Sequence, residues 1–269
     1  MFPTHTGGMA FLEYDYQNQN RNWRGESPSS AAGNDDKKII SNFFTVGYQY
    51  LLNRSWGVMG ELPYTSRYFK ASDEDTGDIA DFTHSSIGDI RLKGIYTGLS
   101  EDLSTGLTFG LRLPTGSYRY SHFDPDVQIG SGSLDLLLGG YHMGSIVPDQ
   151  SWDWFTSGEL DQPVIHSAGY RPGGEIDAAA GAYFNRWRLG PVKIAPLAQF
   201  IGSHRWSDSG ALADAPNTGF SRLLIAPGLE FDTRQVRVYT DVGFPMFQHT
   251  TGNQLVASQY FKLNVSYHF

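Results

Sequence analysis

Apolar and polar residues alternate along most of this chain, and the clearest example is its last twelve residues, 258–269. Every second residue from Phe261 to Phe269 is apolar or aromatic, and the residues between them are polar or amphipathic. Successive side chains of a strand point to opposite faces, so this period of two predicts a strand between an apolar phase and a polar one. The pattern recurs along the chain and predicts an all-β fold. We predict twelve strands, at residues 10–16, 39–52, 56–69, 87–97, 103–118, 131–146, 152–165, 174–187, 192–205, 221–233, 236–247 and 258–269.

The connections between these strands alternate between long and short. Long ones begin near positions 17, 71, 119, 167, 207 and 248, and short ones lie near 53, 99, 148, 189 and 234. A strand needs about 9–11 residues to cross a bilayer at a tilt, and most of the predicted strands are long enough. We therefore predict a single transmembrane antiparallel up-and-down β-barrel of about 12 strands over residues 1–269, with short periplasmic turns and long extracellular loops. A soluble β-fold is the alternative, but it would not be expected to segregate loop lengths in this way.

The terminal strand resembles the C-terminal assembly signal of bacterial outer-membrane β-barrels. Its apolar face ends on an aromatic residue at the chain terminus, and consists of Phe261, Leu263, Val265, Tyr267 and Phe269. The resemblance implies a bacterial outer-membrane location, with the barrel assembly machinery as a partner during insertion. It also implies the lipid bilayer and its outer-leaflet lipid as surroundings.

Composition agrees with a membrane barrel and excludes several other classes. The mean hydropathy is −0.35, because polar residues that face a lumen dilute the apolar ones. No run approaches the roughly 18 apolar residues of a helical membrane span. The absence of Cys excludes disulfides and thiol chemistry, and the net charge of −8 argues against nucleic acid as a partner. The first residues have neither a basic nor an apolar segment, so we expect the mature form of an envelope protein.

The polar faces of the predicted strands carry many more acids than bases. Two interpretations stay open: an electronegative, water-filled route for cations or neutral polar small molecules, and a network of ion pairs that fills the barrel. A barrel of twelve strands has a bore between those of barrels filled by side chains and those with an open channel, so strand number does not decide between the two interpretations. A plug would have to be a loop, and residues 17–38 are the longest candidate. The predicted lumen and selectivity residues are Glu13, Asp15, Glu61, Asp89, Arg91, Lys93, Arg112, Asp135, Asp153, Glu159, Asp161, Glu175, Asp177, Lys193, Glu230, Asp232, Arg237, Asp241 and Lys262.

Three short motifs lie close together between residues 85 and 142. They read SIGDIRL at 86–92, LRLPTG at 111–116 and GSGSLD at 130–135. Pro fixes φ and Gly permits positive φ, so the second motif allows a sharp bend. Together the motifs resemble the "MetA-pathway of phenol degradation" family of outer-membrane transporters. The resemblance implies transport of small molecules, among them aromatic or other hydrophobic compounds.

Prolines interrupt several predicted strands. A closed barrel has no free edge at which Pro is harmless, so they predict strand ends or bulges. Such breaks would let hydrophobic cargo leave sideways into the membrane. The residues are Pro63, Pro114, Pro163, Pro196, Pro227 and Pro245, of which Pro196 and Pro227 are the hardest to place.

Other functions have weaker support in the sequence. A barrel lipid hydrolase would need a serine and a histidine together, and the best pair, Ser133 and His142, lies on opposite faces of one strand. We therefore predict no enzyme, although a hydrolase and a plugged barrel that acts through its extracellular loops stay as alternatives. No phosphate-binding loop or other cofactor motif is present, so we predict no cofactor. The acidic loops at 73–81 and 124–126 do not match the EF-hand spacing, and we predict no metal site.

Overall fold

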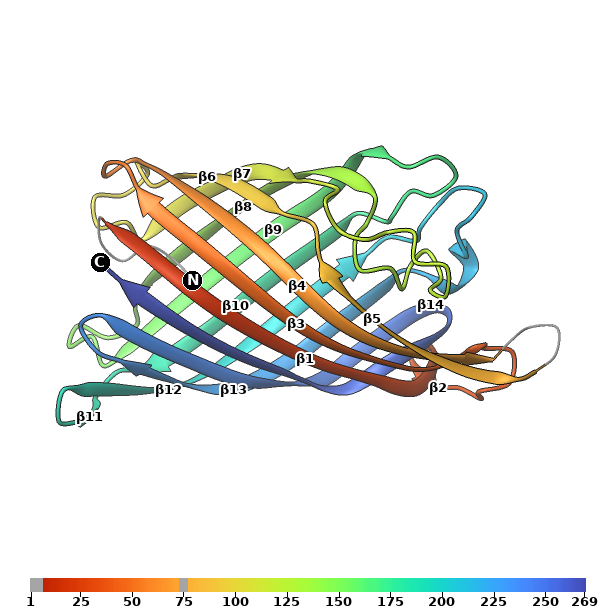
Figure 1. The fold of residues 1–269 in the computed structure, drawn as a ribbon. Coiled ribbons are helices and arrows are strands. Elements are labelled where there is room, and N and C mark those ends of the chain that lie inside the picture. The colour runs from red at the N-terminus through yellow and green to blue at the C-terminus, as the bar shows by residue number, and fades with distance from the viewer. Residues whose placement is uncertain (1–6, 73–76) are drawn as a thin grey trace.

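The structure, a computed structural model, describes residues 7–72 and 77–269. In that part of the chain the only helix is η1 (Ala215–Asn217), and no helix is long and apolar enough to cross a membrane. All other regular elements are strands (Figure 1). These are β1 (Gly8–Gly25), β2 (Ser27–Pro28), β3 (Asp36–Leu51), β4 (Trp56–Ser72), β5 (Ile79–Ile87), β6 (Arg91–Tyr96), β7 (Thr105–Arg112), β8 (Ser133–Ser145), β9 (Trp152–His166), β10 (Glu175–Phe184), β11 (Trp187–Leu189), β12 (Val192–Arg205), β13 (Phe220–Asp232) and β14 (Val236–His268).

The strands form one closed antiparallel barrel. Eleven of them make the ring, in the order β1-β3-β4-β6-β7-β8-β9-β10-β12-β13-β14, and β14 pairs with β1 to close it. β2, β5 and β11 lie outside the ring and pair with β1, β4 and β12. β14 is 33 residues long and folds back at Gly252, whose φ is +69°. Its first arm pairs with β13 and its second with β1, so twelve segments go round the barrel, which confirms the predicted fold.

The barrel closes where the two ends of the chain meet. Gly8 N–H donates to the carbonyl of Phe269 (2.9 Å), and Phe269 N–H donates to the carbonyl of Gly8 (3.0 Å). The start of β1 and the C-terminus lie at the end of the barrel that carries the short turns (Figure 1). On the outer face, the Phe269 ring lies 6.0 Å from that of Tyr48 and is 55% exposed. The aromatic side of the terminal strand therefore faces outward, and its role as an assembly signal stays a prediction.

The predicted alternation is confirmed across the wall. Outward side chains such as Val46 (58% exposed) and Leu138 (59% exposed) are apolar. Side chains that point inward include polar ones that are buried within the barrel, such as Thr65 and Asn264. A soluble protein would hide its apolar side chains inside. This one places them outside, where they face lipid, and pairs most of its wall backbone between strands.

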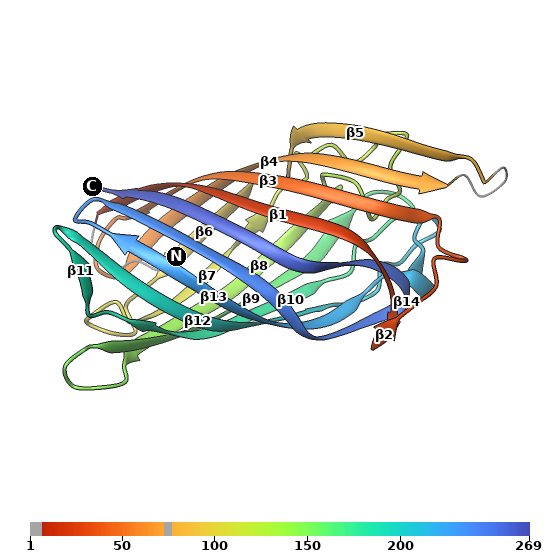
Figure 2. The ribbon, with the colours of Figure 1, turned by 90° about the horizontal axis from the view of Figure 1, so that it is seen from below.

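Several predicted boundaries are wrong, mostly at the extracellular end. Much of the predicted loop 17–38 is strand, because β1 continues to Gly25 and β3 begins at Asp36. The predicted loop 71–86 contains β5, which pairs with β4 and lies beside it in a hairpin that extends past the barrel (Figure 2). The predicted loop 248–257 is the tight turn of β14. Strand pairing in water needs no apolar face, so polar residues there do not mark a loop. Residues 73–76 of the acidic run lie outside the described residues.

The prolines lie where strand pairing is interrupted on one side, as predicted. Pro163 and Pro245 accompany register shifts between β8 and β9 and between β13 and β14. Pro196 lies where the neighbour of β12 changes from β10 to β11. Pro227 lies in a gap of the β13–β14 ladder, between Ile225 and Gly228. A residue without an N–H is tolerated at these points because its missing donor has no partner to satisfy.

The lipid-facing assignment predicts a depth-dependent cost for a charge. Leu138→Arg, near the middle of β8, should lower the free energy of unfolding in phospholipid vesicles by about 2–4 kcal/mol. Leu212→Arg is the matched control, since Leu212 is equally exposed but lies in an extracellular loop, and it should change little. Guanidinium titration of the refolded protein measures both. Equal effects of the two substitutions would contradict the assignment.

Candidate functional site

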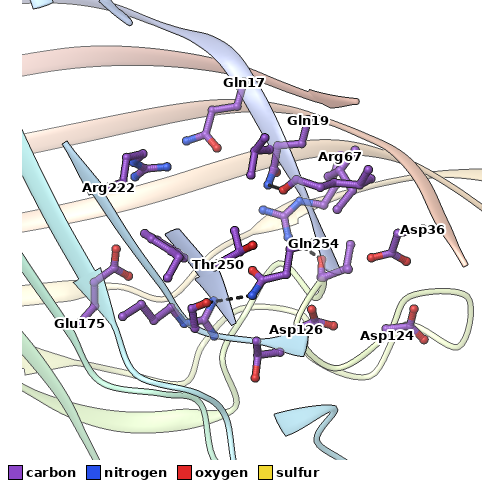
Figure 3. Close-up of a pocket in the computed structure, with 18 of the residues that line it drawn as sticks. Gln17, Gln19, Asp36, Arg67, Asp124, Asp126, Glu175, Arg222, Thr250 and Gln254 are labelled. Carbon is purple, nitrogen blue, oxygen red and sulfur yellow. Dashed lines mark hydrogen bonds between the residues drawn. The ribbon is translucent and has the colours of Figure 1, made fainter. Parts of the chain in front are cut away.

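The barrel encloses a cavity of about 1100 Å³ in its extracellular half (Figure 3). It extends from Glu13 and Lys262 on the inner wall to Asn34, Asp214 and Asn253 in the extracellular connections. Eleven carboxylates line it, against six Lys or Arg side chains. A space with low-dielectric walls strengthens the field of such an excess of one sign of charge.

The predicted lumen residues divide into two groups. Nine of the nineteen line the cavity: Glu13, Asp15, Glu61, Asp89, Arg91, Arg112, Glu175, Asp177 and Lys262. The other ten do not: Lys93, Asp135, Asp153, Glu159, Asp161, Lys193, Glu230, Asp232, Arg237 and Asp241. The role of either group in selectivity stays a prediction.

Ion pairs cover the inner wall around the floor of the cavity. Lys262 Nζ lies 2.9 Å from a Glu13 carboxylate oxygen and 3.2 Å from one of Asp15. Arg112 pairs with Asp161 at 2.9 Å and also with Asp135, which is 0% exposed, so a solute would meet Arg112 and not Asp135. At the wall, these pairs agree with the interpretation of the polar residues as an ion-pair network. In the cavity above them, carboxylates still outnumber Lys and Arg side chains.

Below the cavity, the periplasmic half of the lumen is filled by side chains. The rings of Phe155 and Tyr183 lie 5.3 Å apart, and Gln199 Nε2 donates to the Tyr239 hydroxyl at 2.7 Å. The Phe11 ring covers Gly47, where a β-carbon would lie only 2.0 Å from it. A glycine is therefore required opposite this ring. The cavity lining ends at Glu13, two residues from Phe11 on β1, so the cavity narrows toward the periplasm.

Residues 113–132 form the loop that folds into the extracellular mouth. Phe123 (6% exposed) and Val127 (3% exposed) pack against Ile39, Phe69 and Leu255 of the wall. The sequence offered residues 17–38 as the longest candidate for a plug loop, but strand pairing occupies much of that segment. Apolar residues within this predicted loop, among them Phe123 and Val127, are the signal that could have identified the segment.

The loop is anchored by one buried carboxylate, that of Asp89. Asp89 accepts hydrogen bonds from Gly116 N–H (2.9 Å), Ser131 N–H (2.7 Å) and the Ser131 hydroxyl (2.7 Å). Thr115 Oγ1 donates to the carbonyl of Gly88 (3.0 Å). The three motifs of the sequence thus meet at one junction, between the β5–β6 connection and both ends of the loop. We call it the Asp89 junction.

Two glycines let the loop ends cross at this junction. A β-carbon on Gly130 would lie 2.5 Å from the backbone of Gly116, and one on Gly116 would lie 2.7 Å from Gly130. The junction lies where the strand wall is incomplete. β7 ends at Arg112, β8 begins at Ser133, and β5 pairs only with β4 among the described residues. Loop 113–132, and not a strand, closes the wall there.

The described residues do not form a site for either alternative chemistry, lipid hydrolysis or metal binding. His142 donates to or accepts from the Thr105 hydroxyl (2.8 Å) on the outside, whereas Ser133 bonds to Asp135 inside, so the best serine–histidine pair does not come together. Within residues 7–72 and 77–269, no three or more His, Asp or Glu side chains are arranged to hold a metal ion.

Comparison with known proteins gives similarity at the level of fold. No protein-family model matches the chain, and no curated protein matches its sequence. Among solved structures, the COG4313 outer membrane channel from Pseudomonas putida F1 superimposes with a TM-score of 0.72 at 14% identity, covering 100% of this chain and 97% of that one. The β domain of the Bordetella autotransporter BrkA gives 0.57 at 10% identity, covering 98% and 100%.

The fold and the outward apolar face define the class: a bacterial outer-membrane β-barrel. These likenesses confirm the predicted β-barrel fold, and the outward apolar face agrees with the predicted outer-membrane location. One of the two similar structures is a channel and the other an autotransporter domain, so the fold alone does not fix what the barrel does. The family named by the sequence resemblance is not confirmed by any match.

The Asp89 junction predicts a measurable loosening of the loop. Asp89→Ala removes an acceptor of three hydrogen bonds, each worth about 1.5–3 kcal/mol when the acceptor is charged. Trypsin should then cleave after Arg119, an exposed residue of the loop, at least about tenfold faster in the folded barrel. Asp102→Ala, which removes an acceptor in a short turn at the other end, is the control. Unchanged cleavage in Asp89→Ala would disprove the anchoring role.

Proposed function

We propose that this protein is an outer-membrane channel for small molecules whose acidic cavity favours cations and neutral polar solutes. The observation that carries the proposal is the enclosed extracellular cavity with its excess of carboxylates. The likeness in fold to the Pseudomonas putida outer membrane channel supports it. The paired charges at the floor hold the wall in shape, and the carboxylates above them set the field that a solute meets.

The glutamate and aspartate of β10 are the best test of selectivity. Glu175 and Asp177 line the cavity and lie two residues apart on one face. Glu175→Gln with Asp177→Asn removes two negative charges with little change in shape, so the preference for cations over anions should fall about two- to fivefold. Reversal potentials in a planar bilayer with a salt gradient measure it.

The control is Asp102→Asn, which removes a charge outside the cavity and should leave the reversal potential unchanged. If the wild type and both variants conduct with the same ion preference, selection by the carboxylates is disproved, but the proposed channel is not. A folded barrel that conducts no ions would disprove the aqueous channel. It would favour the plugged barrel that acts through its extracellular loops, because the periplasmic half of the lumen is filled.

A separate observation supports a second function, the lateral release of hydrophobic compounds. The strand wall is incomplete between β5 and β8, and loop 113–132 closes it through the Asp89 junction. We propose that aromatic or other hydrophobic cargo leaves the cavity there and enters the membrane. This route avoids the packed periplasmic half.

Loosening the Asp89 junction should speed lateral release. Asp89→Ala should raise several-fold the initial rate at which a monoaromatic hydrocarbon enters the lipid of proteoliposomes, because the loop no longer closes the wall. Asp89 is itself a cavity carboxylate, so Asp89→Ala should also lower the preference for cations somewhat. If trypsin shows the loop released but the rate of hydrocarbon entry equals that of the wild-type barrel, the lateral route is wrong.

A further inference from the structure

Loop 113–132 has a fixed base and a separable tip. At the base, Asp89 holds Gly116 and Ser131, and Gly130 N–H donates to the carbonyl of Ser117 (2.7 Å). At the tip, no strand pairing holds residues 120–128 to the wall. A segment anchored at both ends can move as a unit without disturbing the barrel.

Two kinds of contact hold the tip inward. Phe123 and Val127 pack against wall residues, with the Phe123 ring 5.5 Å from that of Phe69. Arg67, on β4, donates to the carbonyls of Val127 and Gln128, and its Nε donates to Ser41 Oγ at 2.9 Å. The Arg67 guanidinium therefore donates its hydrogen bonds to neutral oxygens and not to a carboxylate.

Five carboxylates converge on the tip from three parts of the chain. They surround the cavity mouth, where Figure 3 shows Asp36, Asp124 and Asp126. Within the described residues, no ion pair joins any of them to a Lys or Arg side chain. The five are Asp124 and Asp126 on the tip, Asp35 and Asp36 at the start of β3, and Asp214 before η1.

The other charged groups around the tip offset this cluster only in part, since enclosure and Asp124 raise the pKa of Asp126 more than Arg205 lowers it. Arg205 on β12 is held by Asp208 at 2.8 Å, and Lys37 donates to the carbonyl of Asn34. On the side of the loop that faces β5, His122 stacks on Phe82, and His84 stacks on Tyr120 and bonds to Ser117 Oγ. His249, across the mouth, lies 3.8 Å from Glu26.

We infer that the tip of loop 113–132 is a pH-operated gate, closed over the cavity when Asp124 and Asp126 are protonated and released when they ionise beside Asp35, Asp36 and Asp214. This inference rests on the proposed channel function for its purpose, but the movement of the loop does not depend on it.

The direction of the response follows from the carboxyl groups of the tip. Enclosure by the surrounding protein, and then Asp124, raise the pKa of Asp126 from 3.8 to about 6 in the closed loop. Enclosure, Asp35 and Asp214 also raise the pKa of Asp124. In the released loop both groups return to water and to ordinary pKa values. The closed state is therefore fully favoured below pH 3.8, and this advantage is lost as the pH rises through about 6.

The shift at Asp126 sets the expected size of the effect. A pKa difference of about two units between closed and released loop changes their ratio about a hundredfold across the range. Ser121→Cys introduces the only thiol of a chain that has no Cys, and an environment-sensitive fluorophore there reports loop position. Between pH 4.5 and 7.5, the label should pass from an enclosed to a solvated signal, and single-channel current should rise in parallel.

Substitutions assign the response to the carboxylates. Asp126→Asn should keep the loop closed at pH 7.5, and Asp126→Glu, which retains the charge, should restore opening. Asp81→Asn, which removes a carboxylate of β5 outside the cluster, should leave the response intact. His84→Gln with His122→Gln should also leave it intact. The gate is disproved if the label gives one signal at both pH values, if Asp126→Asn responds like the wild type, or if the histidine variant abolishes the response.

The two readouts separate the gate from the channel. A pH-dependent label in a barrel that conducts no ions at any pH would disprove the channel and support the moving loop. A conducting barrel with a pH-independent label and current would disprove the gate and support the channel.

Discussion

Pairing of every backbone N–H and C=O in the ring is the constraint on which the rest of this structure depends. In hydrocarbon an unpaired strand edge costs several kcal/mol for each polar group, so only a closed sheet is stable there. The reciprocal hydrogen bonds between Gly8 and Phe269 complete that closure. Closure fixes which side chains face inward, and so brings acids from β1, β3, β4 and β10 into one cavity.

The same constraint explains where the departures from regular pairing lie. Prolines occupy positions at which one neighbour has shifted or ended, and the single large interruption is between β5 and β8, at the Asp89 junction. There the loop ends supply hydrogen bonds that a strand would otherwise supply. The Asp89 carboxylate accepts three of them, so one buried charge stabilises an opening that could otherwise expose unpaired backbone.

The charged side chains at the floor of the cavity form ion pairs that hold the wall. Within the described residues, the carboxylates at the mouth form no such pairs. Lys262 and Arg112 are held by carboxylates, and such pairs hold the wall but contribute little net field. At the mouth, Asp124 and Asp126 meet other acids, and the tip of loop 113–132 is held to the wall by apolar and ring contacts and by Arg67. Carboxylates that form no ion pair with Lys or Arg in the described part of the chain thus gather at the mouth, beside the tip of the loop.

The sequence by itself determined the barrel, its strand number and the side chains that face lipid, because alternation with a period of two is a local property. It could not determine that the polar residues 17–25 extend a strand, since polar side chains in water permit either strand or loop. Nor could it show that Gly116 and Ser131, which lie 27 and 42 positions from Asp89, share one carboxylate. Only the tertiary structure decided the Asp89 junction, the inward loop and the acidic mouth, because each is built from contacts between distant segments that barrel closure brings together.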